Sequence, residues 1–215
     1  MSFYEHDHLE KSLPKGPRPG FPKQDEGLLA MMRIYLEDRH LHPNIARLNG
    51  WYPTIELDIH PRIVIPCSNS FNIPYFQARS MNDGLPRYRS PAATREGSLA
   101  VVWPRLGVLQ GYVNLKGSVV VEGPMDALAA AYWGYIGIGL MGNDPPEEVF
   151  DYLAHIVPPF GKVIVIPDLD HLEMGATVIG ALAMRNIKKI TMAIPTAKDF
   201  ADMSIASRGY LLEQA

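Results

Sequence analysis

The fold of this chain is decided at two stretches, Val119–Asp126, which reads VVVEGPMD, and Val163–Asp170, which reads VIVIPDLD. In each, a run of β-branched residues ends in acidic side chains, a pattern typical of a buried strand whose carboxyl end faces the ligand crevice of an open α/β sheet. Two such strands would bring Glu122, Asp168 and Asp170 together. Clustered carboxylates repel one another unless a cation lies among them, and oxygen ligands favour Mg²⁺ or Mn²⁺. The two stretches therefore predict a metal site suited to phosphate chemistry.

Strands and helices are predicted to alternate from residue 114 onward. The predicted strands are 118–121, 135–140, 162–166 and 189–194, and the predicted helices are 124–132, 145–156, 172–184 and about 199–212. Such alternation favours a mostly parallel sheet with helices on both faces, so the acidic strand ends would share one edge. Pro124 suits the first position of a helix, and Asp126 could either favour the helix dipole or bind the metal.

The first 113 residues have a different character. Residues 1–24 are rich in proline, glycine and charge and are expected to form a mobile arm. Helices are predicted at 25–39 and 43–48, and short β-rich runs follow at 63–65, 75–78 and 98–102. We therefore expect a small α+β subdomain at 25–113 and an α/β domain at 114–215.

Composition narrows the function classes. With 215 residues, 47% of them hydrophobic, the chain can bury a sizeable core. It has no apolar run that could span a bilayer and no signal-peptide pattern, so we expect no membrane partner and a cytoplasmic location, in a bacterial cell or a phage-infected host. Cys67 is the only cysteine, which excludes an intramolecular disulfide and a zinc site built on several thiolates. The net charge of −3 argues against polyanion binding by the whole surface but leaves room for a local basic patch.

The acidic motifs resemble those of the Toprim domain. They are EGxxD at 122–126, then DxD at 168–170, then Gly175. Toprim domains occur in DnaG-type primases, topoisomerases, a class of nucleases and recombination-mediator proteins. The resemblance implies an α/β Toprim domain at 114–215, with a mostly parallel sheet flanked by helices and preceded by the small α+β subdomain.

The upstream half is similar to the polymerase core of DnaG-type primases and of phage primase-helicases. The similar segments, in order and spacing, are RIVIP at 62–66, QARS at 77–80 and PRYRSP at 86–91. Residues 35–41 resemble the start of that core, with His40 in place of a glycine. The resemblance covers about Leu28 to Ile205, and topoisomerases and nucleases do not carry this preamble.

The resemblance implies a DNA primase core, which synthesises short RNA primers from nucleoside triphosphates on a single-stranded DNA template by metal-dependent nucleotidyl transfer. It assigns Glu122, Asp168 and Asp170 to catalytic metal binding, with Asp126 and Asp199 as outer members of the cluster. The family's Asp-Pro-Asp element is altered here, so either Asp199 or Asp202 could correspond to it.

Four basic residues are candidates for nucleotide or DNA binding. Arg79 and Arg87 are expected to contact the triphosphate or the template backbone, because a planar guanidinium can donate two hydrogen bonds to one phosphate. Arg89 and Lys116 could extend the same patch, although most such residues are solvated surface. His171, next to Asp170, is expected to lie outside the metal ligands.

The chain departs from the family in what it lacks. DnaG-type primases usually carry a zinc-binding domain and a part that engages the replicative helicase, and 215 residues with one cysteine leave room for neither. No bound zinc is expected, and a helicase or a separate zinc-binding or DNA-binding protein is an expected partner. Three explanations for the short chain stay open: an excised core of a longer protein, a minimal phage-type primase, or a protein that uses the fold for another task. The Met1 at the start favours a complete small gene product.

Two rival functions use the same fold. A Toprim nuclease would combine the acidic cluster with a water nucleophile, and metal ligands alone do not distinguish hydrolysis from nucleotidyl transfer. A non-catalytic replication or recombination module would be expected to have lost acidic ligands. The three main carboxylates are present here, which favours catalysis.

Overall fold

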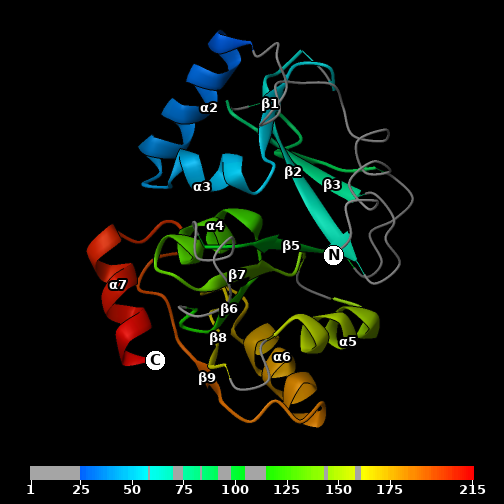
Figure 1. The fold of residues 1–215 in the computed structure, drawn as a ribbon, viewed down its shortest axis with the longest axis vertical. Coiled ribbons are helices and arrows are strands. Elements are labelled where there is room, and N and C mark those ends of the chain that lie inside the picture. The colour runs from blue at the N-terminus through cyan, green and yellow to red at the C-terminus, as the bar shows by residue number, and fades with distance from the viewer. Residues whose placement is uncertain are drawn as a thin grey trace.

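A single sheet runs through the described part of the chain (Figure 1). The computed structural model describes residues 25–57, 59–69, 75–82, 84–91, 98–104, 115–142, 145–157 and 161–215. The expected arm at 1–24 and the expected boundary at 113/114 lie outside these residues. The strands are β1 Tyr52–Thr54, β2 Arg62–Asn69, β3 Tyr75–Ser80, β4 Tyr88–Arg89, β5 Ser98–Val102, β6 Ser118–Val121, β7 Ile136–Gly139, β8 Val163–Val165 and β9 Ile190–Met192.

The sheet has an antiparallel half and a parallel half, in the order β4-β3-β2-β5-β7-β6-β8-β9, with β1 paired to β2. Strands β7, β6, β8 and β9 are parallel, which confirms the predicted parallel sheet. Strand β5 pairs antiparallel with both β2 and β7. It therefore joins the two halves, which the sequence had suggested as separate subdomains, into one sheet.

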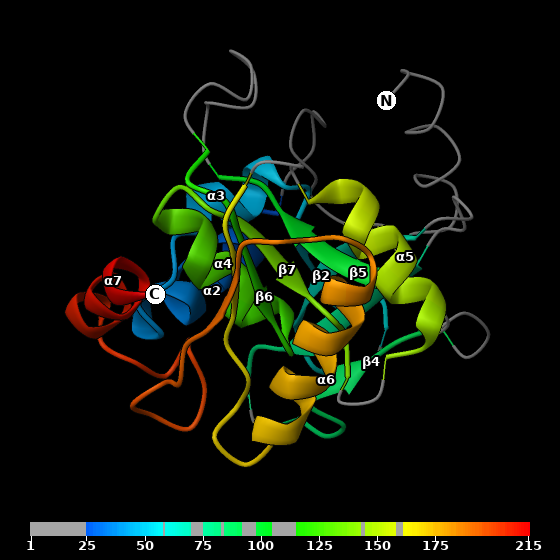
Figure 2. The same ribbon diagram turned by 90° about the horizontal axis from the view of Figure 1, so that it is seen from below.

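Helices cover both faces of the parallel strands (Figure 2). The helices are α2 Glu26–Asp38, α3 Pro43–Leu48, α4 Pro124–Tyr132, α5 Glu147–Ile156, α6 Leu172–Met184 and α7 Ile205–Gln214. Because side chains alternate along a strand, Val119 and Val121 of β6 enter the core beneath α2, α3, α4 and α7. Val120 enters the core beneath α5 and α6. Both faces are thus buried, as the uninterrupted valine run predicts.

Helix α4 packs very closely on β7 because that strand reads Ile-Gly-Ile-Gly. The isoleucines face α5 and α6, and the glycines face α4. A Cβ on Gly137 would lie 1.9 Å from the carbonyl oxygen of Ala127, and a Cβ on Gly139 would lie 2.8 Å from that of Gly123. The absence of side chains at these two positions sets the distance between helix and strand, and with it the position of the turn that follows Glu122.

The predicted start of the last helix, near residue 199, is wrong. Helix α7 begins at Ile205, because Ser204 caps it by accepting a hydrogen bond from the Ser207 amide at 3.2 Å. The Asp199 carboxylate accepts a hydrogen bond from the Asp202 amide at 2.7 Å, which closes a turn in place of a helical start. Residues 199–202 therefore form a loop, and the Ala201 amide in it donates a hydrogen bond to Asp126 in the first turn of α4. No helix in the described part of the chain is both long and apolar enough to span a membrane.

Candidate functional site

The two acidic strand ends meet at the carboxyl edge of the parallel strands. Strands β6 and β8 are adjacent, with Val119 opposite Ile164, so the residues that follow them emerge side by side. The Asp168 amide donates a hydrogen bond to Oε1 of Glu122 at 3.3 Å. Glu122 is 8% exposed, so its carboxylate is held within the fold and presented at this edge. The structure brings Glu122 and Asp168 together.

His171 is the third member of this cluster, and sequence reasoning had placed it outside the ligands. Its Nδ1 lies 3.2 Å from Oε2 of Glu122. Glu122, Asp168 and His171, here called the strand-end group, each offer one ligand atom, and these atoms all lie within 4.8 Å of one another. The sequence contained a signal for this position, because turns that place residue i+3 beside residue i are common directly after a strand. In the structure, the His171 amide donates a hydrogen bond to the Asp168 carbonyl at 3.0 Å and closes such a turn.

Asp170 lies at the rim of the strand-end group. Its side chain is 57% exposed, and its Oδ1 is 3.8 Å from Nδ1 of His171. This carboxylate therefore adds negative charge near the group, but it is not among the three ligand atoms that converge. Its role as a metal ligand stays a prediction.

Negative charge gathers at the strand-end group. Burial, and then the charges of Glu122, Asp199 and Asp170, raise the pKa of Asp168 to about 7. Burial opposes the charged form of His171, but the charge and hydrogen bond of Glu122 outweigh it and raise the pKa of the imidazole. Two carboxylates and an imidazole so close together are donors that fit a divalent cation.

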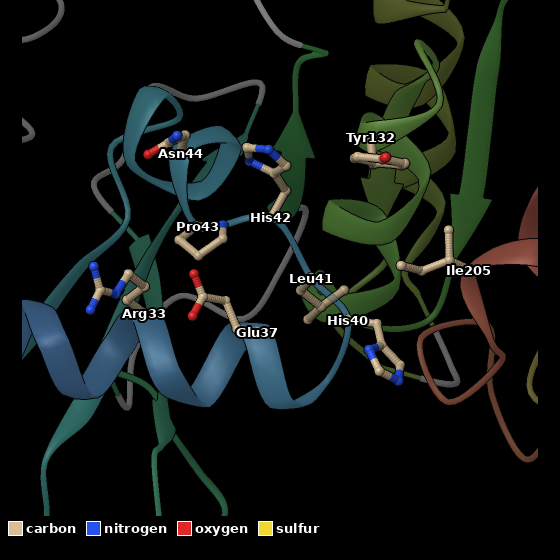
Figure 3. Close-up of a pocket in the computed structure, with 9 residues that line it drawn as sticks. All are labelled: Arg33, Glu37, His40, Leu41, His42, Pro43, Asn44, Tyr132 and Ile205. Atoms are coloured by element: carbon tan, nitrogen blue, oxygen red, sulfur yellow. The ribbon is translucent and has the colours of Figure 1, made fainter.

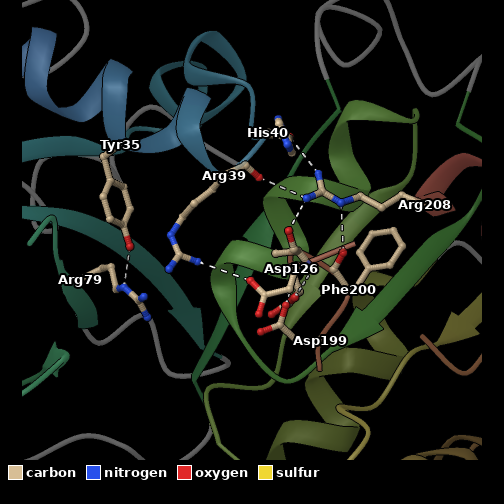
Figure 4. A network of polar contacts seen from close by, with 10 residues as sticks. Tyr35, Arg39, His40, Arg79, Asp126, Asp199, Phe200 and Arg208 are labelled. Atoms are coloured by element: carbon tan, nitrogen blue, oxygen red, sulfur yellow. Dashed lines mark hydrogen bonds and ion pairs between the residues drawn. The ribbon is translucent and has the colours of Figure 1, made fainter. Parts of the chain in front are cut away.

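Asp126 and Asp199 form the buried side of the same region (Figure 4). Asp126, in the first turn of α4, is 7% exposed and accepts a hydrogen bond from the Ala201 amide at 2.7 Å. Burial and then the charge of Asp199 raise its pKa well above the ordinary value. Asp199 also raises the pKa of Asp168, whereas Asp202 faces Arg39, with 3.8 Å between Oδ1 and Nη1. Of the two aspartates left open by the sequence, Asp199 is the one whose charge reaches the acidic region.

Arg208 holds the loop that carries Asp199, a role that the sequence did not reveal. Its side chain is 2% exposed and donates to the carbonyls of Phe200 and Ala201 in that loop, with 3.0 Å between Nε and the Phe200 oxygen. It also donates to the carbonyl of His40 at 2.8 Å and to that of Arg39 at 3.2 Å, at the end of α2 (Figure 4). Burial lowers the pKa of this guanidinium, while the nearby aspartates favour its charge. One side chain thus connects α7, α2 and the Asp199 loop.

A pocket rich in arginine lies near the acidic region. It has a volume of about 260 Å³ and is here called the arginine pocket; its lining is Tyr35, Arg39, Arg79, Met81, Asn82, Gly84, Leu85 and Arg87. The Nε of Arg79 donates to the Tyr35 hydroxyl at 2.8 Å, and its guanidinium lies 4.8 Å from the centre of the Tyr88 ring. Arg39 of this pocket lies 3.8 Å from Asp202 in the loop that carries Asp199, so the pocket borders the acidic region (Figure 4). The structure therefore brings Arg79 and Arg87 together and adds Arg39.

The other two basic candidates lie elsewhere. Arg79 pairs with Tyr88 across β3 and β4, and Arg89 pairs with Ala78, so Arg79 and Arg89 are on opposite faces of the sheet. Lys116 precedes β6, whereas Glu122 follows it, and its Nζ lies 5.9 Å from the centre of the Tyr135 ring. The structure does not bring Arg89 or Lys116 to the arginine pocket or to the strand-end group.

A second pocket, of about 530 Å³, lies among α2, α3, α4 and α7 (Figure 3). Its lining is Arg33, Glu37, His40, Leu41, His42, Pro43, Asn44, Tyr132 and Ile205. The His42 ring stacks on Tyr132 with 5.9 Å between ring centres. None of the strand-end group lines it, so the clustered acids and the arginines identify the functional site better than cavity size does.

Comparison with known proteins confirms the fold. No protein-family model and no curated protein sequence matches the chain. Similar solved structures include a DnaG primase catalytic domain bound to single-stranded DNA, at 14% identity and a TM-score of 0.63, covering 100% of this chain and 80% of that one. The Escherichia coli primase catalytic core matches at 14% identity and a TM-score of 0.61, covering 98% of this chain and 76% of that one. A primase domain from Pseudomonas aeruginosa matches at 17% identity and a TM-score of 0.58, covering 93% of this chain and 72% of that one. The chain has the fold of these catalytic cores.

Proposed function

We propose that this chain, which shares its fold with DnaG primase catalytic cores, is a nucleotidyltransferase that synthesises short RNA primers from nucleoside triphosphates on single-stranded DNA. One observation carries the proposal. A pocket that presents Arg39, Arg79 and Arg87 borders the loop that carries Asp199, because its Arg39 lies 3.8 Å from Asp202, and the charge of Asp199 in turn reaches Asp168 of the strand-end group (Figure 4). A nucleotidyl transfer site needs these two parts, one to hold divalent cations and one to hold phosphates.

The donors present fit divalent cations. Ligand atoms of Glu122, Asp168 and His171 converge within 4.8 Å, and the charges around Asp168 raise its pKa, so a cation would relieve repulsion that the fold leaves in place. Glu122 and Asp168 would hold the ion, with Asp170 at the rim and Asp126 and Asp199 behind. When bound, Mg²⁺ or Mn²⁺ neutralises charge that develops on the transferring phosphoryl group and aligns the reacting oxygens.

The arginine pocket would bind the triphosphate. Arg79 is oriented before any ligand arrives, because Tyr35 accepts its Nε–H and Tyr88 lies against its guanidinium plane. Its guanidinium, which also hydrogen-bonds Tyr88, would donate to phosphate oxygens from its terminal nitrogens, a geometry that suits the planar fork of arginine. Arg87, which is exposed, would contact the same phosphates or the template backbone. Binding energy spent on the unreactive phosphates would position the reacting one over the acids.

The remaining partners follow from the proposed reaction. Single-stranded DNA would be the template, and nucleoside triphosphates the substrates. A replicative helicase or a separate zinc-binding or DNA-binding protein would select the start site. The cytoplasmic location, the phage-type origin and DNA binding by Arg89 and Lys116 stay predictions.

The test is primer synthesis by the purified protein on single-stranded DNA, with labelled nucleoside triphosphates and Mg²⁺ or Mn²⁺. Short labelled RNA should form, and Asp168→Asn should reduce its yield by about a hundredfold or more, because metal ligands act together. The matched control is Glu148→Gln, which neutralises an exposed carboxylate on α5. Input DNA that is shortened without nucleotide incorporation would assign a nuclease instead, and no activity with added helicase and zinc-binding protein would assign a binding module.

A further inference from the structure

His171 brings an imidazole nitrogen into a group that the sequence suggested to be oxygen-only. Its Nδ1 lies 3.2 Å from Oε2 of Glu122 and 3.8 Å from Oδ1 of Asp170. With Glu122 and Asp168 it places three ligand atoms within 4.8 Å of one another. Metal ligands bind in their deprotonated form, in which two carboxylates and one imidazole carry a charge of −2, and this matches a divalent cation.

The backbone directs this side chain toward the acids. Strand β8 ends at Val165, and Pro167 follows two residues later. The turn from Asp168 to His171 is closed by the hydrogen bond that the His171 amide donates to the Asp168 carbonyl at 3.0 Å. This turn places His171 at the N-cap position of α6, where Ser, Asp or Asn would normally bond the first amides of the helix. Its side chain makes no such capping bond. Helix capping therefore does not explain its orientation, and the strand-end group does.

We propose that His171 is a metal ligand, and that the strand-end group is a mixed nitrogen and oxygen site that takes Mn²⁺ in preference to Mg²⁺. The proposal rests on the metal-dependent function proposed above and specifies the ion. Mg²⁺ requires oxygen ligands in near-ideal octahedral geometry, whereas first-row transition ions gain affinity from an imidazole nitrogen. Mn²⁺ also accepts the two carboxylates, so it suits both kinds of donor in this group.

The alternative role for His171 is that of a charge partner. A protonated imidazole 3.2 Å from Glu122 would form an ion pair with it and would compete with any cation for that carboxylate. The two roles predict opposite results. As a metal ligand, His171 would strengthen the binding of Mn²⁺ more than that of Mg²⁺. As a charge partner of Glu122, it would weaken the binding of both ions alike.

The decisive measurement is pulsed electron paramagnetic resonance of Mn²⁺ bound to the protein, without nucleotide or DNA. The wild type should show ¹⁴N coupling to the ion, and ¹⁵N-histidine labelling should convert it to the ¹⁵N pattern. This result needs no variant, so it holds even if substitutions at His171 impair folding. Absence of nitrogen coupling on bound Mn²⁺, or a failure of Mn²⁺ to bind, overturns the proposal.

Calorimetric titration tests the selectivity. His171→Asn should weaken Mn²⁺ binding by about tenfold and change Mg²⁺ binding by less than about twofold, because only the transition ion gains from the nitrogen. The matched control is His155→Asn, at an exposed position near the end of α5. Tighter binding of both ions by His171→Asn would assign the charge-partner role, and equal losses for both ions would overturn the preference for Mn²⁺. Because neither measurement involves synthesis, a protein that binds Mn²⁺ through nitrogen yet makes no primer would refute the proposed function and leave this inference standing.

Discussion

Asp168 combines partial burial with three acidic neighbours, and this combination raises the pKa of its carboxyl from 3.8 to about 7. The folded protein therefore holds this proton more tightly than the unfolded chain does. By linkage, the group stabilises the metal-free fold fully below about pH 4, and this contribution is lost as the pH rises through 7. A bound divalent cation would replace the proton and restore the lost stability.

Metal should accordingly stabilise the protein more at pH 8 than at pH 6. We expect saturating Mn²⁺ or Mg²⁺ to raise Tm by a larger amount at pH 8, because at pH 6 the ion must displace a proton from Asp168. Differential scanning calorimetry with and without metal measures the two increments. In Asp168→Asn, the difference between the metal-induced rise in Tm at pH 8 and that at pH 6 should shrink. Equal rises in Tm at the two pH values in the wild type would contradict the raised pKa of Asp168.

Arg79 and Arg89 are two residues of one chemical type that the sheet places on opposite faces. Arg79→Lys should raise KM for nucleoside triphosphates by about tenfold, because lysine keeps the charge but loses the planar fork that Tyr35 and Tyr88 orient. Arg89→Lys should leave KM nearly unchanged. Steady-state kinetics of primer synthesis measures both, and equal increases would mean that the phosphates extend to the other face.

Arg208 is a buried cation whose partners are backbone carbonyls. Arg208→Met keeps much of the side-chain volume but leaves the carbonyls of Phe200, Ala201 and His40 without this donor, at a cost of about 3 kcal/mol in the free energy of unfolding. Urea denaturation measures the loss. The control is Arg33→Met on the exposed side of α2, which should stay within about 0.5 kcal/mol of the wild type. A similarly small effect at Arg208 would show that the Asp199 loop holds its position without it.

The contact between α4 and β7 depends on glycine. Gly137→Ala would place a Cβ 1.9 Å from the Ala127 carbonyl oxygen, so the helix must move away from the strand, at a cost of about 1–3 kcal/mol or more. Gly180→Ala is the matched control, because it makes the same substitution at an exposed position of α6, where a Cβ would meet no atom within 4 Å. It should stabilise the protein by about 0.5–1 kcal/mol, since alanine favours helix over glycine.

Thermal or urea unfolding of these two variants tests the close packing. Opposite signs are the expected outcome, and a loss at Gly180 as large as that at Gly137 would indicate a general effect of replacing glycine. Because α4 begins directly after Glu122, Gly137→Ala should also weaken metal binding, whereas Gly180→Ala should not.

The two halves of the molecule share one sheet and one core. Strand β5 pairs with β2 on one side and with β7 on the other, and a single cluster of buried residues includes Met32 and Ile63 from one half and Val119 and Ile164 from the other. The arginine pocket belongs to the first half and the strand-end group to the second. Their relative position is therefore set by continuous strand pairing.

Such a core should unfold as one unit. Urea denaturation followed by tryptophan fluorescence, which reports on Trp51, Trp103 and Trp133 from both halves, and by far-ultraviolet circular dichroism should give coincident single transitions. Two separated transitions would indicate that the halves fold independently, as the sequence-based division into 25–113 and 114–215 suggests.

The sequence by itself determined most elements of the parallel half and the edge at which the acids lie. Strand β6, helix α4 and helix α6 occur within the predicted ranges, because uninterrupted valines, a proline at the first helical position and helical spacing are local signals. Parallel strands place their carboxyl ends at one edge of the sheet, so the proximity of Glu122 and Asp168 could be predicted from the sequence pattern alone.

Only the tertiary structure decided which side chains complete the site. The turn spacing places His171 beside Asp168, but Glu122 is 49 positions away from His171 in the sequence, and only the pairing of β6 with β8 brings them together. Arg208 and His40 are 168 positions apart, and no local signal connects them. Loop conformation and strand pairing likewise determine that Asp199 acts on Asp168 while Asp202 faces Arg39, that α7 starts late, and that Arg89 is separated from Arg79. The physical reason is that residue type and spacing specify local backbone preference, whereas side-chain proximity arises when distant segments pack against a common sheet.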